Sequence, residues 1–123
     1  MGNNKFNKKT NFDYKLCTNS NDDKRCVLKF SSCDDKYPLH FLNKEELKGF
    51  ISYAKKVESL SWREIKTYSG LNFEALPKLK KPDNLTPDIT LFSMRVTQKF
   101  RIVGYRQDEF FYIVWFDRNH ETC

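Results

Sequence analysis

Basic side chains stand on both sides of a short turn near the C-terminal end of the chain. Arg95 and Arg101 are six residues apart, and Lys99 lies in the turn between them. A turn centred near Gln98 makes the two arginines near cross-strand neighbours, whose like charges repel. An anion between them would relieve that repulsion, because guanidinium groups bind phosphate bidentately and stabilise the charge of a phosphoryl-transfer transition state. The alternative is that both arginines line a solvated outer face of a sheet.

A histidine that could transfer a proton follows the last predicted strand. It ends the sequence Asp117-Arg118-Asn119-His120. Histidine gains or loses a proton near neutral pH, and Asp117 would orient His120 or pair with an arginine. The alternatives are a surface-loop histidine and an aspartate that forms a turn after the strand.

Three consecutive strands must position these side chains. Apolar and polar residues alternate along them with the period of a β-strand. The strands are expected at residues 89–97, 100–106 and 109–117, with turns at Thr97–Lys99 and Gln107–Asp108. The last strand is apolar on both faces, which predicts a central strand buried on both sides. The alternative is that its aromatic side chains Phe110, Tyr112, Trp115 and Phe116 stack on nucleic-acid bases.

A strand and two helices precede these strands. Residues 25–31 alternate, with Cys26, Leu28 and Phe30 on one face. Asn43 and Ser61 each precede a glutamate by three residues, which predicts two helices that begin with capping boxes. In the first helix the apolar residues Leu47, Phe50, Ile51, Ala54 and Val57 follow helical spacing. The fold class is therefore α+β, with the order β-α-α-β-β-β and a helical hairpin packed on an antiparallel or mixed sheet.

The composition favours one domain with an anionic partner. The chain has 123 residues, a net charge of +6 and 15% aromatic residues. Residues 1–24 are expected to be a mobile or accessory segment, and residues 25–123 to form the domain. The sequence shows no export signal and no apolar run long enough to span a membrane, so a cytoplasmic location is expected. In that compartment the four cysteines of the chain are expected to be reduced thiols. The cysteine spacing does not match structural zinc sites, so neither a metal nor a cofactor is expected.

The segment Ser93-Met94-Arg95-Val96-Thr97-Gln98-Lys99-Phe100-Arg101-Ile102-Val103-Gly104-Tyr105 resembles the signature of the RelE/ParE/HigB superfamily of toxin–antitoxin toxins. In that family a strand that ends in Leu-Arg leads through a basic turn into an aromatic-Arg pair and a second strand. The element order, the length and the approach segment LPKLKK are also similar. The resemblance covers roughly residues 25–120. It does not cover the N-terminal segment, and Thr122 and Cys123 stand where several members have a tyrosine.

The resemblance implies an mRNA interferase, an endoribonuclease in which a 2′-hydroxyl attacks the adjacent phosphate without a metal. Arg95, Lys99, Arg101, Asp117 and His120 are then the catalytic candidates. The RNA-binding candidates are Lys78, Lys80, Lys81, Arg106 and Arg118. The implied partners are RNA, including mRNA on the ribosome, and an antitoxin that adds an acidic helix or strand to the basic face. Two alternatives remain open: a non-catalytic module that binds nucleic acid or protein, and a ParE-like inhibitor of gyrase.

Overall fold

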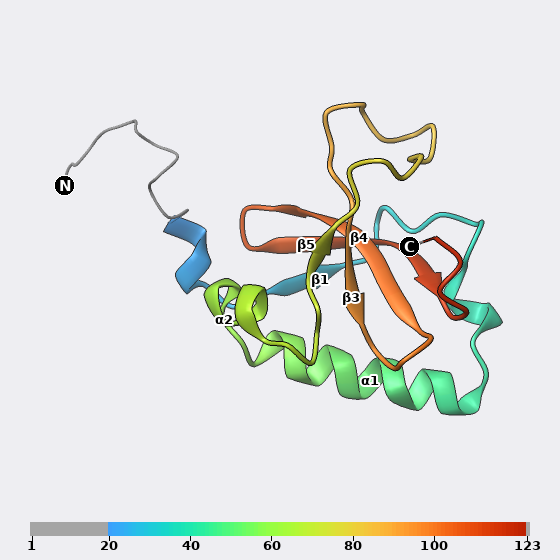
Figure 1. The fold of residues 1–123 in the computed structure, drawn as a ribbon, viewed down its shortest axis with the longest axis horizontal. Helices are drawn as coiled ribbons and strands as arrows, with labels where there is room; N and C mark the ends of the chain where they lie inside the picture. The colour runs from blue at the N-terminus through green and yellow to red at the C-terminus, as the bar shows by residue number, and fades with distance from the viewer. Residues whose placement is uncertain (1–19, 123) are drawn as a thin grey trace.

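The computed structural model describes residues 20–122 and places them in an α+β fold, as predicted (Figure 1). The elements in chain order are η1 (Ser20–Asp23), β1 (Val27–Lys29), η2 (Leu39–Phe41), α1 (Lys44–Glu58), α2 (Trp62–Thr67), β2 (Glu74–Ala75), β3 (Phe92–Arg95), β4 (Arg101–Gln107) and β5 (Phe110–Asp117). Within this part of the chain, no helix is long and apolar enough to cross a membrane.

A mixed five-stranded sheet forms the centre of the fold, in the order β1-β5-β4-β3-β2. β1 pairs with β5 in parallel, and the other neighbouring strands are antiparallel. The apolar strand β5 has a neighbour on each side, which confirms it as a central strand. The two-residue edge strand β2 was not predicted, because a pairing this short leaves no alternating pattern in a sequence.

Both helices begin as their sequences predict. The Asn43 side chain accepts a hydrogen bond from the backbone N–H of Glu46, and the Glu46 carboxylate accepts one from the N–H of Asn43. Ser61 and Glu64 make the same reciprocal pair at the start of α2. Each box satisfies two backbone donors that have no partner inside the helix.

The first helix buries a face that differs from the predicted one. Phe50 and Val57 are buried as expected, and Tyr53 joins them with 5% of its surface exposed. Leu47 and Ile51 instead lie on the outside, with 42% and 53% of their surfaces exposed. The reason is the rotation of α1 on the sheet, which brings the Tyr53 hydroxyl within 3.4 Å of the Met94 sulfur. Leu47 and Ile51 then fall on the flank of the helix.

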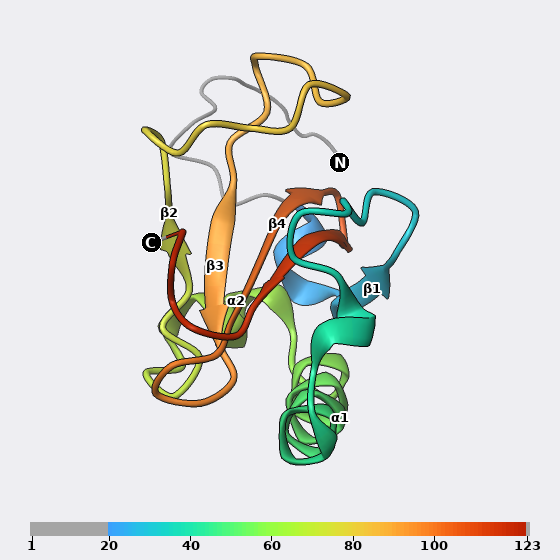
Figure 2. The ribbon, with the colours of Figure 1, turned by 90° about the vertical axis from the view of Figure 1, so that its right-hand side faces the viewer.

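Each face of the sheet has its own core. On the helix side, Met94, Ile102 and Phe116 pack in one cluster with Phe50 and Trp62. On the other face, a second cluster contains Val103, Val114 and Trp115 of the sheet. They pack with Leu91, which precedes β3, and with Tyr37, Leu76, Leu79 and Leu85. The long loop between β2 and β3 extends from the end of the sheet that lies away from α1 (Figures 1 and 2). Its leucines cover part of the face that the helices leave open.

The turn between β4 and β5 is shifted by one residue from the prediction. Gln107 pairs with Phe110, so the two turn residues are Asp108 and Glu109. Asp108 adopts a positive φ of 59°, a conformation that aspartate tolerates better than most residues. The prediction of Gln107 as a turn residue was wrong, because the strand pattern does not show which residue takes the left-handed conformation.

A buried carboxylate ties the start of the described chain to the domain. Asp22 is 4% exposed, and its carboxylate lies 2.9 Å from the Lys66 ammonium and 2.8 Å from the Arg106 guanidinium. Arg106 also lies over the Trp62 ring, 4.3 Å from its centroid. Residues 20–24 of the predicted accessory segment are therefore held against α2 and β4, and residues 1–19 lie outside the described part of the chain.

Replacing Asp22 with asparagine is expected to lower the free energy of unfolding by about 3 kcal/mol near neutral pH, because it leaves Arg106 buried without its counter-charge. Burial alone raises the pKa of Asp22, but the hydrogen bonds and charges of Lys66 and Arg106 lower it below its ordinary value of 3.8. The charged carboxylate therefore makes its full contribution to the free energy of unfolding above pH 3.8, and this contribution is lost as the pH falls through the pKa of Asp22 in the folded protein.

Urea unfolding near pH 7 and near pH 3 measures this effect. The difference between wild type and the Asp22→Asn variant should shrink at the lower pH. Asp23→Asn is the matched control, since the Asp23–Arg63 pair is exposed and should contribute no more than about 1 kcal/mol. If Asp22→Asn lowers the free energy of unfolding equally at both pH values, the charge of Asp22 has no role in stability.

Candidate functional site

The predicted arginine pair is formed. Arg95 and Arg101 are direct partners in the register of β3 and β4, which confirms them as cross-strand neighbours. Asp117 on β5 is in turn the partner of Arg101. Residues directly opposite one another in neighbouring strands project to the same face, so these three side chains form one row across the sheet. Because the preceding residue, Met94, faces the helices, the row lies on the opposite face.

The two arginines differ sharply in exposure. Arg95 is exposed, whereas Arg101 has only 7% of its surface exposed. The Arg101 guanidinium donates a hydrogen bond to the backbone carbonyl of Thr97 across the turn. Among residues 20–122 it forms no ion pair. A buried guanidinium without a carboxylate partner is costly, and a bound anion would compensate its charge.

The carboxylate of Asp117 holds the C-terminal tail. It is fully buried and accepts hydrogen bonds from the backbone N–H of Glu121 at 2.8 Å and of Thr122 at 2.7 Å. The Thr122 hydroxyl donates a third bond at 2.6 Å. Asp117 therefore orients the turn that carries His120 and does not pair with an arginine of the described chain.

His120 lies at the surface of this turn with a positive φ of 58°. The tail then crosses to β2 (Figure 2). There Thr122 lines a cavity with Ala75 and residues of the following loop. The tail therefore spans the sheet from β5 to β2, on the same side of the domain as the arginine row. Asp117, which anchors the tail, is itself the third member of that row.

The remaining lysine candidates lie in exposed loops. Lys99 is exposed in the turn between β3 and β4, beside the arginine pair. Lys78 and Lys80 are exposed and Lys81 is half-buried in the loop after β2. Lys80 and Lys81 line a cavity of about 500 Å³ that also contains Asp34, Lys36, Asp83 and Trp115. Lys80 and Lys81 therefore share a polar surface, whereas Lys78 lines the cavity beside Thr122.

Two predicted RNA-binding residues are engaged within the fold. Arg106 pairs with the buried Asp22 on the helix side of the sheet. The Arg118 guanidinium lies 3.0 Å from the Glu46 carboxylate, which is also part of the capping box of α1. Neither residue joins Arg95 and Arg101 in the row.

The aromatic residues of β5 fall into two groups. Trp115 and Phe116 are buried, as a central strand predicts. Phe110 and Tyr112 are half-buried, and Tyr112 stacks on Tyr105 with ring centroids 5.0 Å apart. The Trp115 indole N–H donates a hydrogen bond to the Asp34 carboxylate at 3.0 Å.

The sequence reasoning missed that one arginine of the pair is buried. Tyr37 and Trp115 contribute to the second core beside the arginine row. Loop residues such as Leu79 and Leu85 carry a weak signal for this packing, since they are apolar within an otherwise polar segment.

Comparison with known proteins adds no assignment to this site. No protein-family model, no curated protein and no solved structure matches the chain. Across residues 20–122, no group of three or more His, Cys, Asp or Glu side chains is placed to hold a metal ion. The Cys26 thiol is a poor nucleophile, because burial, only partly offset by Arg106, raises its pKa to about 12.

Proposed function

We propose that the chain is a RelE-like toxin that acts in the cytoplasm as an endoribonuclease. The observation that carries this proposal is the pairing of Arg95 with Arg101, whose guanidinium is buried and has no carboxylate partner in the described chain. Such a pair suits a phosphodiester, which is anionic and gains charge in its transition state. The α+β fold, in which β1 and two helices precede β3, β4 and β5, supports the proposal, although the short strand β2 is an addition to the expected order.

The proposed reaction is a transesterification within the RNA. The 2′-oxygen of one nucleotide forms a bond to the adjacent phosphorus, and the 5′-oxygen of the next nucleotide leaves. The products are a 2′,3′-cyclic phosphate and a 5′-hydroxyl. A base takes the proton of the 2′-hydroxyl, an acid protonates the leaving oxygen, and Arg95 and Arg101 stabilise the negative charge on the phosphate.

Incubation of purified protein with RNA in EDTA tests the function. Cleavage that leaves cyclic phosphate and 5′-hydroxyl ends is the expected result. If RNA is bound with a steep salt dependence and stays intact, with or without ribosomes, the chain is a binding module. If overproduced gyrase restores the growth of cells that express the chain, the chain is a gyrase inhibitor instead.

His120→Ala is expected to lower the cleavage rate more than tenfold, because His120 is the proposed acid or base. Single-turnover cleavage of the same RNA measures this loss. Asn119→Ala, in the same exposed turn, is the matched control and should retain the wild-type rate. An unchanged rate in His120→Ala would remove His120 from the mechanism.

An acidic antitoxin is the proposed protein partner. The net charge of +6 favours an acidic partner. On α1 the exposed apolar residues Leu47 and Ile51 lie beside the exposed Lys44, Lys48 and Lys55, a combination that fits an amphipathic acidic segment. Co-expression with a short acidic protein from a neighbouring reading frame should suppress the toxicity of the chain. Ile51→Asp should weaken the complex between the two proteins.

A further inference from the structure

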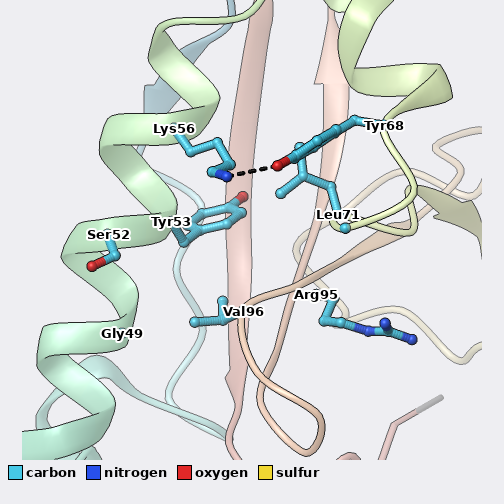
Figure 3. Close-up of a pocket in the computed structure, with 9 residues that line it drawn as sticks. Gly49, Ser52, Tyr53, Lys56, Tyr68, Leu71, Arg95 and Val96 are labelled. Carbon is cyan, nitrogen blue, oxygen red and sulfur yellow. Dashed lines mark hydrogen bonds between the residues drawn. The ribbon is translucent and has the colours of Figure 1, made fainter.

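A cavity of about 210 Å³ lies between α1 and the segment that follows α2, on the helix side of the sheet (Figure 3). Its walls are formed by residues of α1, of the segment after α2 and of the end of β3: Gly49, Ser52, Tyr53, Lys56, Tyr68, Gly70, Leu71, Arg95 and Val96. Among residues 20–122, no carboxylate lines it. The lining includes the polar side chains of Ser52, Lys56, Tyr68 and Arg95 as well as apolar groups.

The polar side is a lysine–tyrosine pair. The Lys56 ammonium donates a hydrogen bond of 2.7 Å to the Tyr68 hydroxyl, and Figure 3 shows the two side chains reaching toward each other across the opening. Lys56 forms no ion pair with the described residues. The ammonium also lies 4.8 Å from the centroid of the Tyr68 ring, and without a carboxylate partner its charge can still attract an anion. The phenol that accepts its hydrogen bond becomes a stronger donor to the same anion.

The apolar side offers a surface for a ring. Tyr53, Leu71 and Val96 form this wall, and the Tyr68 side chain stands at the edge with 39% of its surface exposed. Exposed aromatic rings in basic surroundings stack on the bases of single-stranded nucleic acid. The combination of a cation without a carboxylate partner in the described chain and a partly exposed ring is therefore suited to a nucleotide.

Arg95 connects this cavity to the arginine pair. The residue lines the cavity, but Figure 3 shows its guanidinium extending away from α1. The backbone N–H of Arg95 donates a 2.6 Å hydrogen bond to the carbonyl of Leu71, which fixes the cavity wall to the strand that carries the pair. An RNA strand held by Arg95 and Arg101 could thus pass around the end of β3 into the cavity.

We infer that this cavity is a subsite for a second nucleotide of the RNA, whose phosphate is held by Lys56 and whose base stacks on Tyr68. The inference rests on the proposed function, since it extends the RNA path from the arginine pair. The subsite contributes to binding and not to the chemical step. Variants of it should therefore raise KM and leave kcat unchanged.

Binding of a short 2′-O-methyl RNA, which lacks the attacking hydroxyl, measures the subsite without cleavage. Fluorescence anisotropy over a range of salt concentrations should show that Lys56→Ala weakens binding about tenfold and lowers the salt slope by about 0.7, as the loss of one phosphate contact predicts. Tyr68→Ala should also weaken binding about tenfold, whereas Tyr68→Phe keeps most of the affinity because it keeps the ring.

Lys55→Ala is the matched control, because Lys55 is the exposed neighbour of Lys56 on α1 and does not line the cavity. It should change affinity less than twofold. Equal effects of Lys55→Ala and Lys56→Ala would overturn the subsite while leaving the proposed cleavage intact. Binding that depends on Lys56 in a protein that never cleaves RNA would support the subsite and overturn the endoribonuclease. A wild-type protein that binds no RNA would overturn both.

Discussion

Arg101→Ala is expected to lower the rate of RNA cleavage by roughly a hundredfold, a typical effect of losing one preorganised group that stabilises transition-state charge. Arg101 is 7% exposed, and its hydrogen bond to the Thr97 carbonyl holds the guanidinium in place before substrate arrives. Partial exclusion of water strengthens its interaction with the phosphate. Single-turnover cleavage at saturating RNA measures the effect on the chemical step.

The same substitution removes the bond to Thr97, so the free energy of unfolding must be measured beside the rate. Arg95→Ala separates the two effects, because Arg95 is exposed and its loss should slow cleavage about tenfold with little change in stability. Arg63→Ala, on the outside of α2, is the control arginine and should cleave at the wild-type rate. A folded Arg101→Ala variant that cleaves normally would contradict the proposed function.

Gly104→Ala is expected to lower the free energy of unfolding by about 3 kcal/mol or more. A Cβ at this position would lie 2.1 Å from the Tyr112 carbonyl oxygen and 3.0 Å from the Phe111 ring. Gly104 is buried next to the register shift between β4 and β5, where neither the backbone nor a core ring can easily move. Urea unfolding measures the loss.

Gly49→Ala is the matched control for this substitution. Its added Cβ would meet the Val96 side chain at 3.5 Å, which is ordinary van der Waals contact. Because Gly49 lies inside α1, alanine should raise stability by about 0.5–1 kcal/mol through helix propensity. Equal stability of Gly104→Ala and wild type would show that β5 can shift away from β4.

Local features of the fold could be predicted from the sequence, because they depend on residues close together in the chain. The capping boxes at Asn43 and Ser61 require only residues three positions apart. The pairing of Arg95 with Arg101 requires only a short turn between alternating strands. The central position of β5 follows from its unbroken apolar composition.

Only the tertiary structure decided which charged residues are available for a ligand. Arg106 and Arg118 resemble Arg101 in the sequence, yet the first pairs with Asp22 and the second with Glu46, each more than seventy residues away. Arg101 is buried and has no such partner among the described residues. Ion pairing and burial depend on contacts between distant segments, and a sequence pattern with a period of two or 3.6 residues contains no information about them.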